Sequence, residues 1–190
     1  VANPKMEIGD VTPANWITSN NDLTNETGWV TDEAHSLTHS LKIVNTTHAN
    51  ASWQGKAVSF DAPYPTKLSF SGWAKALDVI DSTTHFMLNF RVVFTDGTHE
   101  WLHDDLSFNK ETHDWESVQS AKEFLNPVKS VAPLCVFYGG TGTAWFDDVF
   151  IQAELPNIRN FSDFDSGYVH FFIKTLVDLE VSLRSANIGE

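Results

Sequence analysis

Tryptophan residues with polar neighbours are the feature of this sequence best suited to chemistry. Sugars present apolar C–H faces that stack on aromatic rings, while their hydroxyl groups need polar partners. Trp73 shares the parity of Ser69, Ser71 and Lys75, so all four side chains are expected on the polar face of one strand. This pattern predicts an aromatic platform for a glycan at Trp73.

Further polar and aromatic residues extend this prediction. Asn89 and Arg91 lie on the non-core face of a second predicted strand, Trp101 follows Glu100, and Trp53 precedes Gln54. The predicted ligand-binding residues are therefore Trp73, Trp101, Trp53, Asn89, Arg91 and Glu100. In the alternative interpretation, each Trp ring packs beneath a loop or an added helix. Met87 and an apolar tail that could lie across this face also weaken the sugar interpretation.

Short strands separated by turn residues must position these side chains. In residues 85–94, large apolar residues alternate with mostly polar ones, which predicts a central core strand. Asp96-Gly97 follows and predicts a hairpin with a return strand over 99–103. Other strands are expected over 36–43, 52–60, 68–75, 115–120, 131–138 and 144–153, with a turn at 139–142 between the last two. The predicted core comprises Leu41, Ile43, Phe70, Phe86, Leu88, Phe90, Val92, Val149 and Ile151.

Strands at this spacing are typical of an all-β sandwich or barrel. We predict a sandwich domain over residues 1–155 and a C-terminal extension over 156–190. From Tyr168 onward the apolar residues fit a helical stripe, but they also alternate with period two, so the extension is helical or extended. Its apolar surface is expected to pack on the sandwich, on a partner subunit in a homo- or hetero-oligomer, or on a ligand.

Composition excludes several function classes. The net charge of −13 repels phosphate backbones and anionic lipid, which argues against nucleic-acid and membrane-surface roles. No apolar run approaches the about 20 residues that span a bilayer. The single cysteine, Cys135, rules out an internal disulfide and is expected to be buried, although an intermolecular bridge is an alternative. No nucleophile elbow, P-loop or dinucleotide fingerprint is present, so no enzymatic activity is predicted.

Glycosylation sequons indicate the cellular compartment in which the protein is expected. Four sites fit the N-x-[ST] pattern, at Asn25, Asn45, Asn50 and Asn160. Together with the single cysteine, they favour a secreted, extracellular glycoprotein.

Several segments, in the right order, resemble carbohydrate-binding modules of the family 4, 9 and 22 type. The first is residues 3–9 followed by Trp16, the next is Ser40-Leu-Lys-Ile43, and the third is residues 68–76 around Trp73. The closing strand, residues 142–151, contains Trp-Phe-Asp-Asp-Val, the best of these matches. The resemblance covers about residues 3–153 and implies a galactose-binding-like jelly-roll β-sandwich that binds carbohydrate.

The resemblance also implies a structural Ca²⁺ ion. In such modules a Glu of the first strand and an Asp of the last strand share calcium with backbone carbonyls; the matching residues here are Glu7 and Asp147, or Asp148. Asp147 shares the parity of Trp145, Val149 and Ile151 and is expected to point inward. First and last strands can lie side by side in a jelly roll, and a cation offsets the repulsion between carboxylates. In the alternative interpretation these acids are solvated.

The sequence therefore predicts a non-catalytic, secreted carbohydrate-binding module with a structural calcium. Two other functions stay open. The 14 Phe and 7 Trp residues and the apolar tail also fit a binder of an apolar small molecule, such as a lipid or a carotenoid pigment. The tail and Cys135 fit a structural subunit of an extracellular oligomeric assembly.

Overall fold

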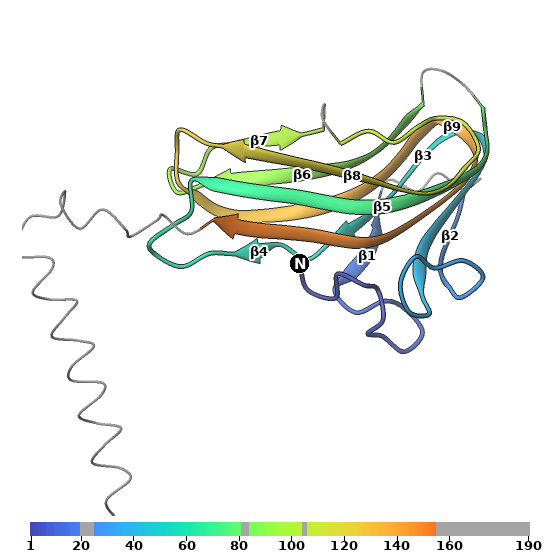
Figure 1. Ribbon diagram of the computed structural model, residues 1–190, viewed down its shortest axis with the longest axis horizontal. Coiled ribbons are helices and arrows are strands. Elements are labelled where there is room, and N and C mark those ends of the chain that lie inside the picture. Colours follow the sequence, from blue (N-terminus) through green and yellow to red (C-terminus); the bar gives the residue numbers. More distant parts are fainter. Residues whose placement is uncertain (20–24, 81–83, 104–105, 155–190) are drawn as a thin grey trace, which may run out of the picture. The chain divides into compact units, whose positions relative to one another are not determined.

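The fold is an all-β, jelly-roll sandwich, as predicted. The computed structural model describes residues 1–19, 25–80, 84–103 and 106–154, and these contain strands, turns and no helix (Figure 1). Within them, no helix has the length and hydropathy required to cross a membrane. The predicted C-terminal extension, 156–190, lies outside the described residues. The strands are β1 (Trp16–Ser19), β2 (Asn25–Val30), β3 (Ser40–Gly55), β4 (Val58–Ser59), β5 (Lys67–Ile80), β6 (His85–Phe94), β7 (His99–Leu102), β8 (His113–Glu123) and β9 (Val128–Glu154).

Two long strands, β3 and β9, take part in both layers of the sandwich. In one layer, the β6 sheet, the later half of β3 and the first half of β9 give the order β1-β3-β9-β6-β7. In the other, the β5 sheet, the first half of β3 and the later half of β9 give the order β2-β3-β9-β5-β8. All these pairings are antiparallel. The register of β3 with β9 breaks between Asn45 and Asn50, where the strands pass from one sheet to the other.

The core lies between the two sheets and is built by alternation along their central strands. Every second residue of β6 from Phe86 to Val92 is fully buried, and the Phe90 ring lies 4.7 Å from that of Phe70 on β5. At Gly72 a Cβ atom would lie 2.6 Å from Leu88 Cδ1, so glycine permits this close approach. All predicted core residues are buried except Ile151, which is partly buried and packs against the core. Cys135 is a buried free thiol, as expected.

The turn chemistry was partly predicted. Gly97 adopts a φ of 87°, and Asp96 accepts a hydrogen bond from the Thr98 N–H at 2.9 Å, so the Asp-Gly hairpin is confirmed. The glycine-rich segment 139–142 is not a turn between two strands, because it lies within the single strand β9. There Gly139 and Gly142 have φ values of 76° and 121°, and they let β9 bend from one sheet into the other.

The segment before β3 differs most from prediction. A strand was expected from residue 36, but β3 begins at Ser40, and Leu37 is 72 % exposed with a φ of 58°. Residues 31–39 form a loop, called the strap below. Backbone N–H groups of the strap bind the carboxylates of Glu7 and Asp147, so those groups are not available for strand pairing.

Candidate functional site

Three predicted ligand-binding residues lie together on the outer face of the β6 sheet. Asn89 and Arg91 alternate with the buried core residues of β6, so both side chains point away from the core. Arg91 lies directly opposite Trp101 of β7, and the Trp101 side chain is 44 % exposed. An aromatic ring, a guanidinium and an amide therefore come together on one surface, which we call the Asn89 face.

The floor of the Asn89 face is apolar and closely covered. Leu134 and Val136 of β9 lie opposite Asn89 and Met87, respectively. They do not belong to the core cluster between the sheets, yet they are 7 % and 2 % exposed. The apolar floor of this face is therefore almost fully covered within the folded chain, and Asn89, Arg91 and Trp101 lie beside it.

Polar groups of β3 complete the other side of this face. Gln54 lies opposite Leu134, in the same cross-strand row as Asn89. The hydroxyl of Tyr138 donates to Ser52 Oγ at 3.1 Å, and Ser52 Oγ donates to the Ser19 carbonyl at 2.9 Å. These bonds fix the Tyr138 ring at one end of the face.

Asn89 carries an unused hydrogen-bonding atom. Its Oδ1 is buried and has no hydrogen-bond partner among the described residues. A buried amide oxygen without a donor is costly, by about 1–3 kcal/mol, so such groups are uncommon in folded proteins. A ligand hydroxyl or a water molecule that donated to this atom would remove the cost. Sequence reasoning selected Asn89 for its type and parity, and the structure adds this unmet acceptor.

Glu100 does not belong to the Asn89 face. It lies opposite the core residue Val92, so it has the reverse parity of Trp101. Its Oε1 lies 2.9 Å from Nζ of Lys122 on β8, at the edge where the two sheets approach. Glu100 therefore links the sheet edges, and its prediction as a neighbour of Trp101 in a ligand site is not supported by this geometry.

Trp73 lies on the other layer of the sandwich and is already covered on one side. The His35 imidazole stacks on its ring with centroids 3.8 Å apart and planes 15° from parallel. Trp115 of β8 meets the same imidazole edge-on, with centroids 5.7 Å apart. Trp73 and Asn89 thus face opposite directions, and the predicted site that contained both is divided between two surfaces.

Trp53 is a core residue, so its prediction as a surface ligand contact was wrong. It is 4 % exposed and belongs to the core cluster. Its indole Nε1 donates to the Lys42 carbonyl at 3.1 Å, which satisfies the polar atom of the buried ring. The alternation of Ala51 and Trp53 with Ser52 and Gln54 was the signal that could have placed this ring inside.

A hollow lies on the outer face of the β5 sheet. Its volume is about 420 Å³, and its lining combines an aromatic ring with amides and hydroxyls: Ser69, Phe70, Ser71, Gln119, Ser120, Ala121, Phe150 and Gln152. Phe150 is 40 % exposed and was not predicted. Asp148 has a φ of 51° at a break in the β5–β9 register. This bulge reverses the parity of β9, so Phe150 faces outward while Val149 faces the core.

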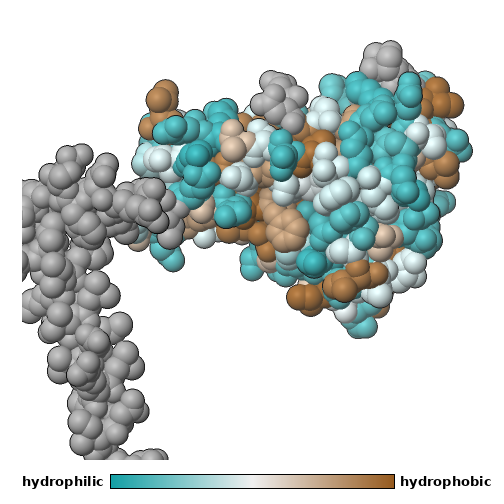
Figure 2. Space-filling view, in the orientation of Figure 1, coloured by the Kyte–Doolittle hydropathy of each residue, from teal (hydrophilic) through white to brown (hydrophobic). Residues whose placement is uncertain are grey.

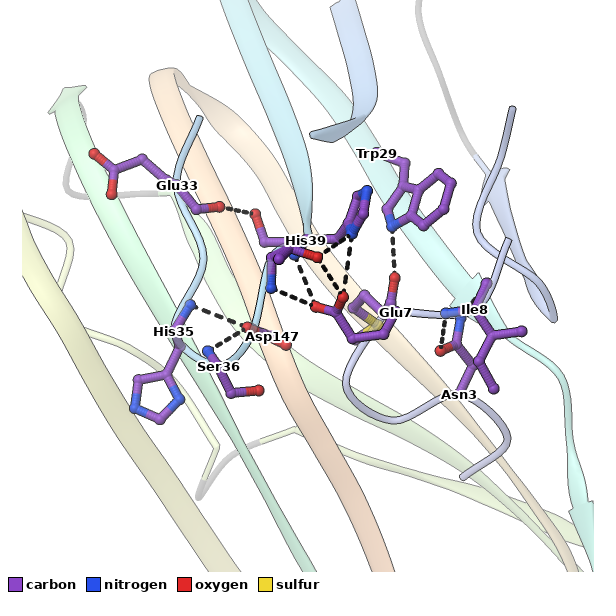
Figure 3. Close-up of polar contacts among 12 residues, drawn as sticks. Asn3, Glu7, Ile8, Trp29, Glu33, His35, Ser36, His39 and Asp147 are labelled. Atoms are coloured by element: carbon purple, nitrogen blue, oxygen red, sulfur yellow. Dashed lines mark hydrogen bonds and ion pairs between the residues drawn. The ribbon is translucent and has the colours of Figure 1, made fainter. Parts of the chain in front are cut away.

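Because of this bulge, Asp147 does not share the core-facing side of Val149, so its predicted inward orientation was wrong. Trp145 and Asp147 lie opposite Lys75 and Trp73 of β5, on the outer face, whereas Val149 is in the core. Asp147 is nevertheless fully buried, because the strap lies over it (Figure 3). Its Oδ2 accepts the His35 and Ser36 N–H groups at 3.0 and 2.9 Å.

Asp148 and Glu7 bind further donors of the strap. Asp148 accepts Ser36 Oγ at 2.9 Å, and its other oxygen lies 2.7 Å from His35 Nδ1. Glu7 Oε1 accepts the Thr38 and His39 N–H groups at 2.9 and 2.8 Å, and Oε2 accepts the Thr38 hydroxyl at 2.6 Å. The acids predicted to share calcium thus bind neighbouring parts of the same loop, Asp147 and Asp148 at its middle and Glu7 at its end (Figure 3).

Burial and hydrogen bonds move the pKa values of these acids in opposite directions. Burial of Asp147, with a smaller contribution from the neighbouring Asp148 charge, raises its pKa from 3.8 to about 6, although three backbone N–H groups oppose the shift. For Glu7, desolvation also acts to raise the pKa. The hydrogen bonds from Thr38 and His39 together outweigh it and lower the pKa from 4.5 to about 2.

Two of the predicted glycosylation sites, Asn45 and Asn50, differ in exposure. Asn45 is 2 % exposed, and its Nδ2, the atom to which a glycan would be attached, donates to the Ala49 and Phe137 carbonyls at 3.2 and 3.1 Å. The folded chain therefore has no room for a glycan there, which corrects that prediction. Asn50 is exposed. Asn25 begins β2, and Asn160 lies outside the described residues.

Comparisons with known proteins agree on the fold. No protein-family model matches the sequence, and no curated protein matches it. The structure of a family 61 module, TmCBM61, in complex with beta-1,4-galactotriose is similar with a TM-score of 0.54 and 12 % identity, over 81 % of this chain and 97 % of that one. The CBM22-1 xylan-binding domain of Paenibacillus barcinonensis Xyn10C gives 0.51 and 14 %, over 78 % and 90 %.

A third similar structure comes from a larger protein. The enzymatically active domain of tailspike protein 4 from Bacteriophage CBA120 matches with a TM-score of 0.58 and 14 % identity, over 81 % of this chain but 21 % of that one. Identities this low establish the fold alone. The chain therefore has the jelly-roll fold of carbohydrate-binding modules, and the roles of its residues rest on the geometry described above.

Proposed function

We propose that this chain is a non-catalytic carbohydrate-binding module whose ligand lies across the Asn89 face. The observation that carries this proposal is the buried, unpartnered Oδ1 of Asn89, close to the exposed Trp101 ring and Arg91. A sugar hydroxyl can donate to the amide oxygen while a C–H face of the same chain stacks on the indole. The fold shared with carbohydrate-binding modules supports this assignment.

Charge narrows the class of carbohydrate. The net charge of −13 disfavours polyanionic glycans, because the field of the whole protein repels them. The charge of Arg91 on the Asn89 face is small against that field. The proposed ligand is therefore a neutral oligosaccharide or polysaccharide. A secreted, extracellular location, inferred from the sequons, accords with such a ligand and is part of the same proposal.

An apolar small molecule is the second candidate ligand. Met87, Leu134 and Val136 give the Asn89 face an apolar floor that a lipid or pigment would also contact. Leu134 and Val136 are almost fully shielded, so little of this floor is free to bind. This shielding favours the sugar. Figure 2 shows one side of the described surface, without singling out the Asn89 face; that side is mainly hydrophilic, with hydrophobic residues in small separate groups.

The test is a screen of neutral glycans followed by calorimetric titration of the best ligand. Removing a stacking ring should cost at least about 1.4 kcal/mol, which is tenfold in Kd. We therefore expect Trp101→Ala to weaken binding at least tenfold and the matched control Phe150→Ala, on the other sheet, to leave it unchanged.

Two other outcomes would change the proposed site or the proposed ligand. The reverse result, in which only Phe150→Ala weakens binding, would move the site to the 420 Å³ hollow of the β5 sheet and overturn the Asn89 face. Silence across neutral glycans, with a lipid or pigment detected by native mass spectrometry, would replace the carbohydrate with the apolar ligand.

A further inference from the structure

The strap is held at several points along its length. Near its start, Asp32 pairs with Lys42, and Glu33 Oε2 lies 3.0 Å from Nζ of Lys75. The Glu33 carbonyl accepts the Ser40 hydroxyl at 2.6 Å, which ties the start of the strap to its end. Between these points, the strap covers the buried side chain of Asp147. The strap is therefore an ordered part of the sandwich surface.

Every carboxylate oxygen of Glu7, Asp147 and Asp148 has a protein partner within hydrogen-bond distance. Asp147 Oδ2 and Glu7 Oε1 each accept two backbone N–H groups, from His35 and Ser36 and from Thr38 and His39. The second oxygen of Asp147 accepts the Asp148 N–H at 2.7 Å. Both oxygens of Asp148 and the second oxygen of Glu7 also have partners in the strap.

This arrangement does not fit calcium. A Ca²⁺ ion needs about 6–8 oxygen ligands at about 2.3–2.6 Å, and a ligand oxygen must present a lone pair to it. An ion bound by Asp147 Oδ2 would displace the N–H groups of His35 and Ser36, whose positive ends already point at that oxygen. No group of three or more acidic, His or Cys side chains within the described ranges converges as a metal site would require.

We propose that the strap takes the place of a structural cation in this sandwich. Its successive backbone N–H groups, two directed at Asp147 and two at Glu7, supply the positive ends that neutralise the buried and part-buried acids. The contact between the strap and Asp147 also places the His35 imidazole on the Trp73 ring, and Asp148 holds the imidazole through Nδ1. The strap anchors the N-terminal segment through Glu7 and the later half of β9 through Asp147, so a hydrogen-bonded loop fastens parts of the chain about 140 positions apart.

The first test measures the thermal midpoint of the full chain in EDTA and in millimolar CaCl₂, together with elemental analysis of the purified protein. We expect one Tm in both buffers and no stoichiometric calcium. A Tm that falls in EDTA and returns with CaCl₂, or one bound calcium per chain by calorimetric titration, would overturn the proposal.

The second test follows hydrogen exchange at individual strap amides. The His35, Ser36, Thr38 and His39 N–H groups should be protected in the wild type, equally with and without EDTA. Glu7→Ala should release the Thr38 and His39 amides, and Asp147→Ala the His35 and Ser36 amides, each by at least tenfold. Glu26→Ala, an exposed acid on β2, is the matched control and should change none of them.

Two results would contradict the hydrogen-bonded strap. These amides could exchange freely in the wild type, or they could lose protection when EDTA is added. Should Asp147→Ala fail to fold, Glu7→Ala still tests the Thr38 and His39 amides directly, and Asp148→Ala tests whether the side-chain contacts to His35 and Ser36 hold the middle of the strap. None of these measurements involves a sugar, so their outcome is independent of the proposed carbohydrate site.

Discussion

The imidazole of His35 lies flat on the indole of Trp73, with ring centroids 3.8 Å apart and planes inclined by 15°. His35 comes from the strap and Trp73 from β5, so this stack joins a loop to a sheet. The covered indole face cannot also stack on a sugar. Trp101, which is 44 % exposed, keeps that capacity on the opposite layer. The sandwich therefore uses one tryptophan for packing on one face, and the proposed function assigns ligand stacking to another tryptophan on the opposite face.

Removing the His35 ring should loosen the strap. An aromatic pair contributes about 0.5–1.5 kcal/mol beyond its buried area. We expect His35→Ala to lower the free energy of unfolding by about 1–2 kcal/mol in urea denaturation and to shift tryptophan emission to longer wavelength. The exposed His85 on β6 provides the control, since His85→Ala should change neither quantity. Unchanged stability and emission in His35→Ala would show that the stack contributes nothing.

Phe90 should be among the most costly residues to truncate. It is fully buried and contacts the Phe70 ring across the two sheets. Large-to-small substitutions of this kind typically cost about 3–5 kcal/mol, because a cavity remains. Urea denaturation of Phe90→Ala should show that loss, while Leu125→Ala, at a fully exposed leucine, should stay within about 0.5 kcal/mol of the wild type. A loss below about 1 kcal/mol for Phe90→Ala would contradict a tightly packed core.

The two neighbouring sequons should behave differently. Asn45→Ala leaves the Ala49 and Phe137 carbonyls without their donor, so we expect a cost of about 1–3 kcal/mol. Asn50→Ala, at an exposed position, should cost less than Asn45→Ala. In a secretory expression host, peptide mass spectrometry should find Asn45 of the folded protein without a glycan. Full glycan occupancy at Asn45 in folded protein would contradict the buried amide.

Glu7 should stabilise the fold above pH 4.5 and cease to do so in acid. Its pKa falls from 4.5 to about 2 on folding, so the unfolded chain takes up its proton first as the pH is lowered. The stability difference between wild type and Glu7→Gln should thus be full above pH 4.5 and shrink toward pH 2. Denaturation curves across this range test it, and a difference independent of pH would count against the strap contacts.

Asp147 should show the opposite dependence. Its pKa rises from 3.8 to about 6, so the folded protein retains a proton that the unfolded chain has lost. Relative to Asp147→Asn, which cannot titrate, the wild type should gain stability as the pH falls from 7 to 4. The same denaturation series provides the measurement. If the stability difference for Asp147 changed with pH in the same direction as that for Glu7, burial would not control the pKa of Asp147.

Alternation within strands made much of this fold predictable from sequence. Phe86, Leu88 and Phe90 share one parity, which places them in the core whatever the topology. Parity does not say which layer a strand joins, and for that reason Trp73 and Asn89 were grouped although they face opposite directions. The Asp96-Gly97 turn was predictable because its chemistry is local.

The remaining differences come from contacts between distant segments. A bulge at Asp148 reverses the parity of β9, which turns Phe150 outward and leaves Asp147 on the outer face. The strap adopts its path because Glu7 and Asp147 bind its N–H groups from more than 30 and 110 positions away, respectively. Neither feature has a local signature in the sequence beyond the paired Asp147-Asp148.

The most direct measurement for the proposed function compares stability and affinity in a single variant, Asn89→Ala. Because the substitution removes an amide oxygen that lacks a donor, urea denaturation should show unchanged or slightly higher stability. Calorimetric titration with the best neutral glycan should show at least tenfold weaker binding, because the sugar hydroxyl loses its acceptor. Stability that falls by more than about 1 kcal/mol while affinity stays at the wild-type value would contradict the account, since Asn89 would then be a structural residue and the Asn89 face would not be the binding site.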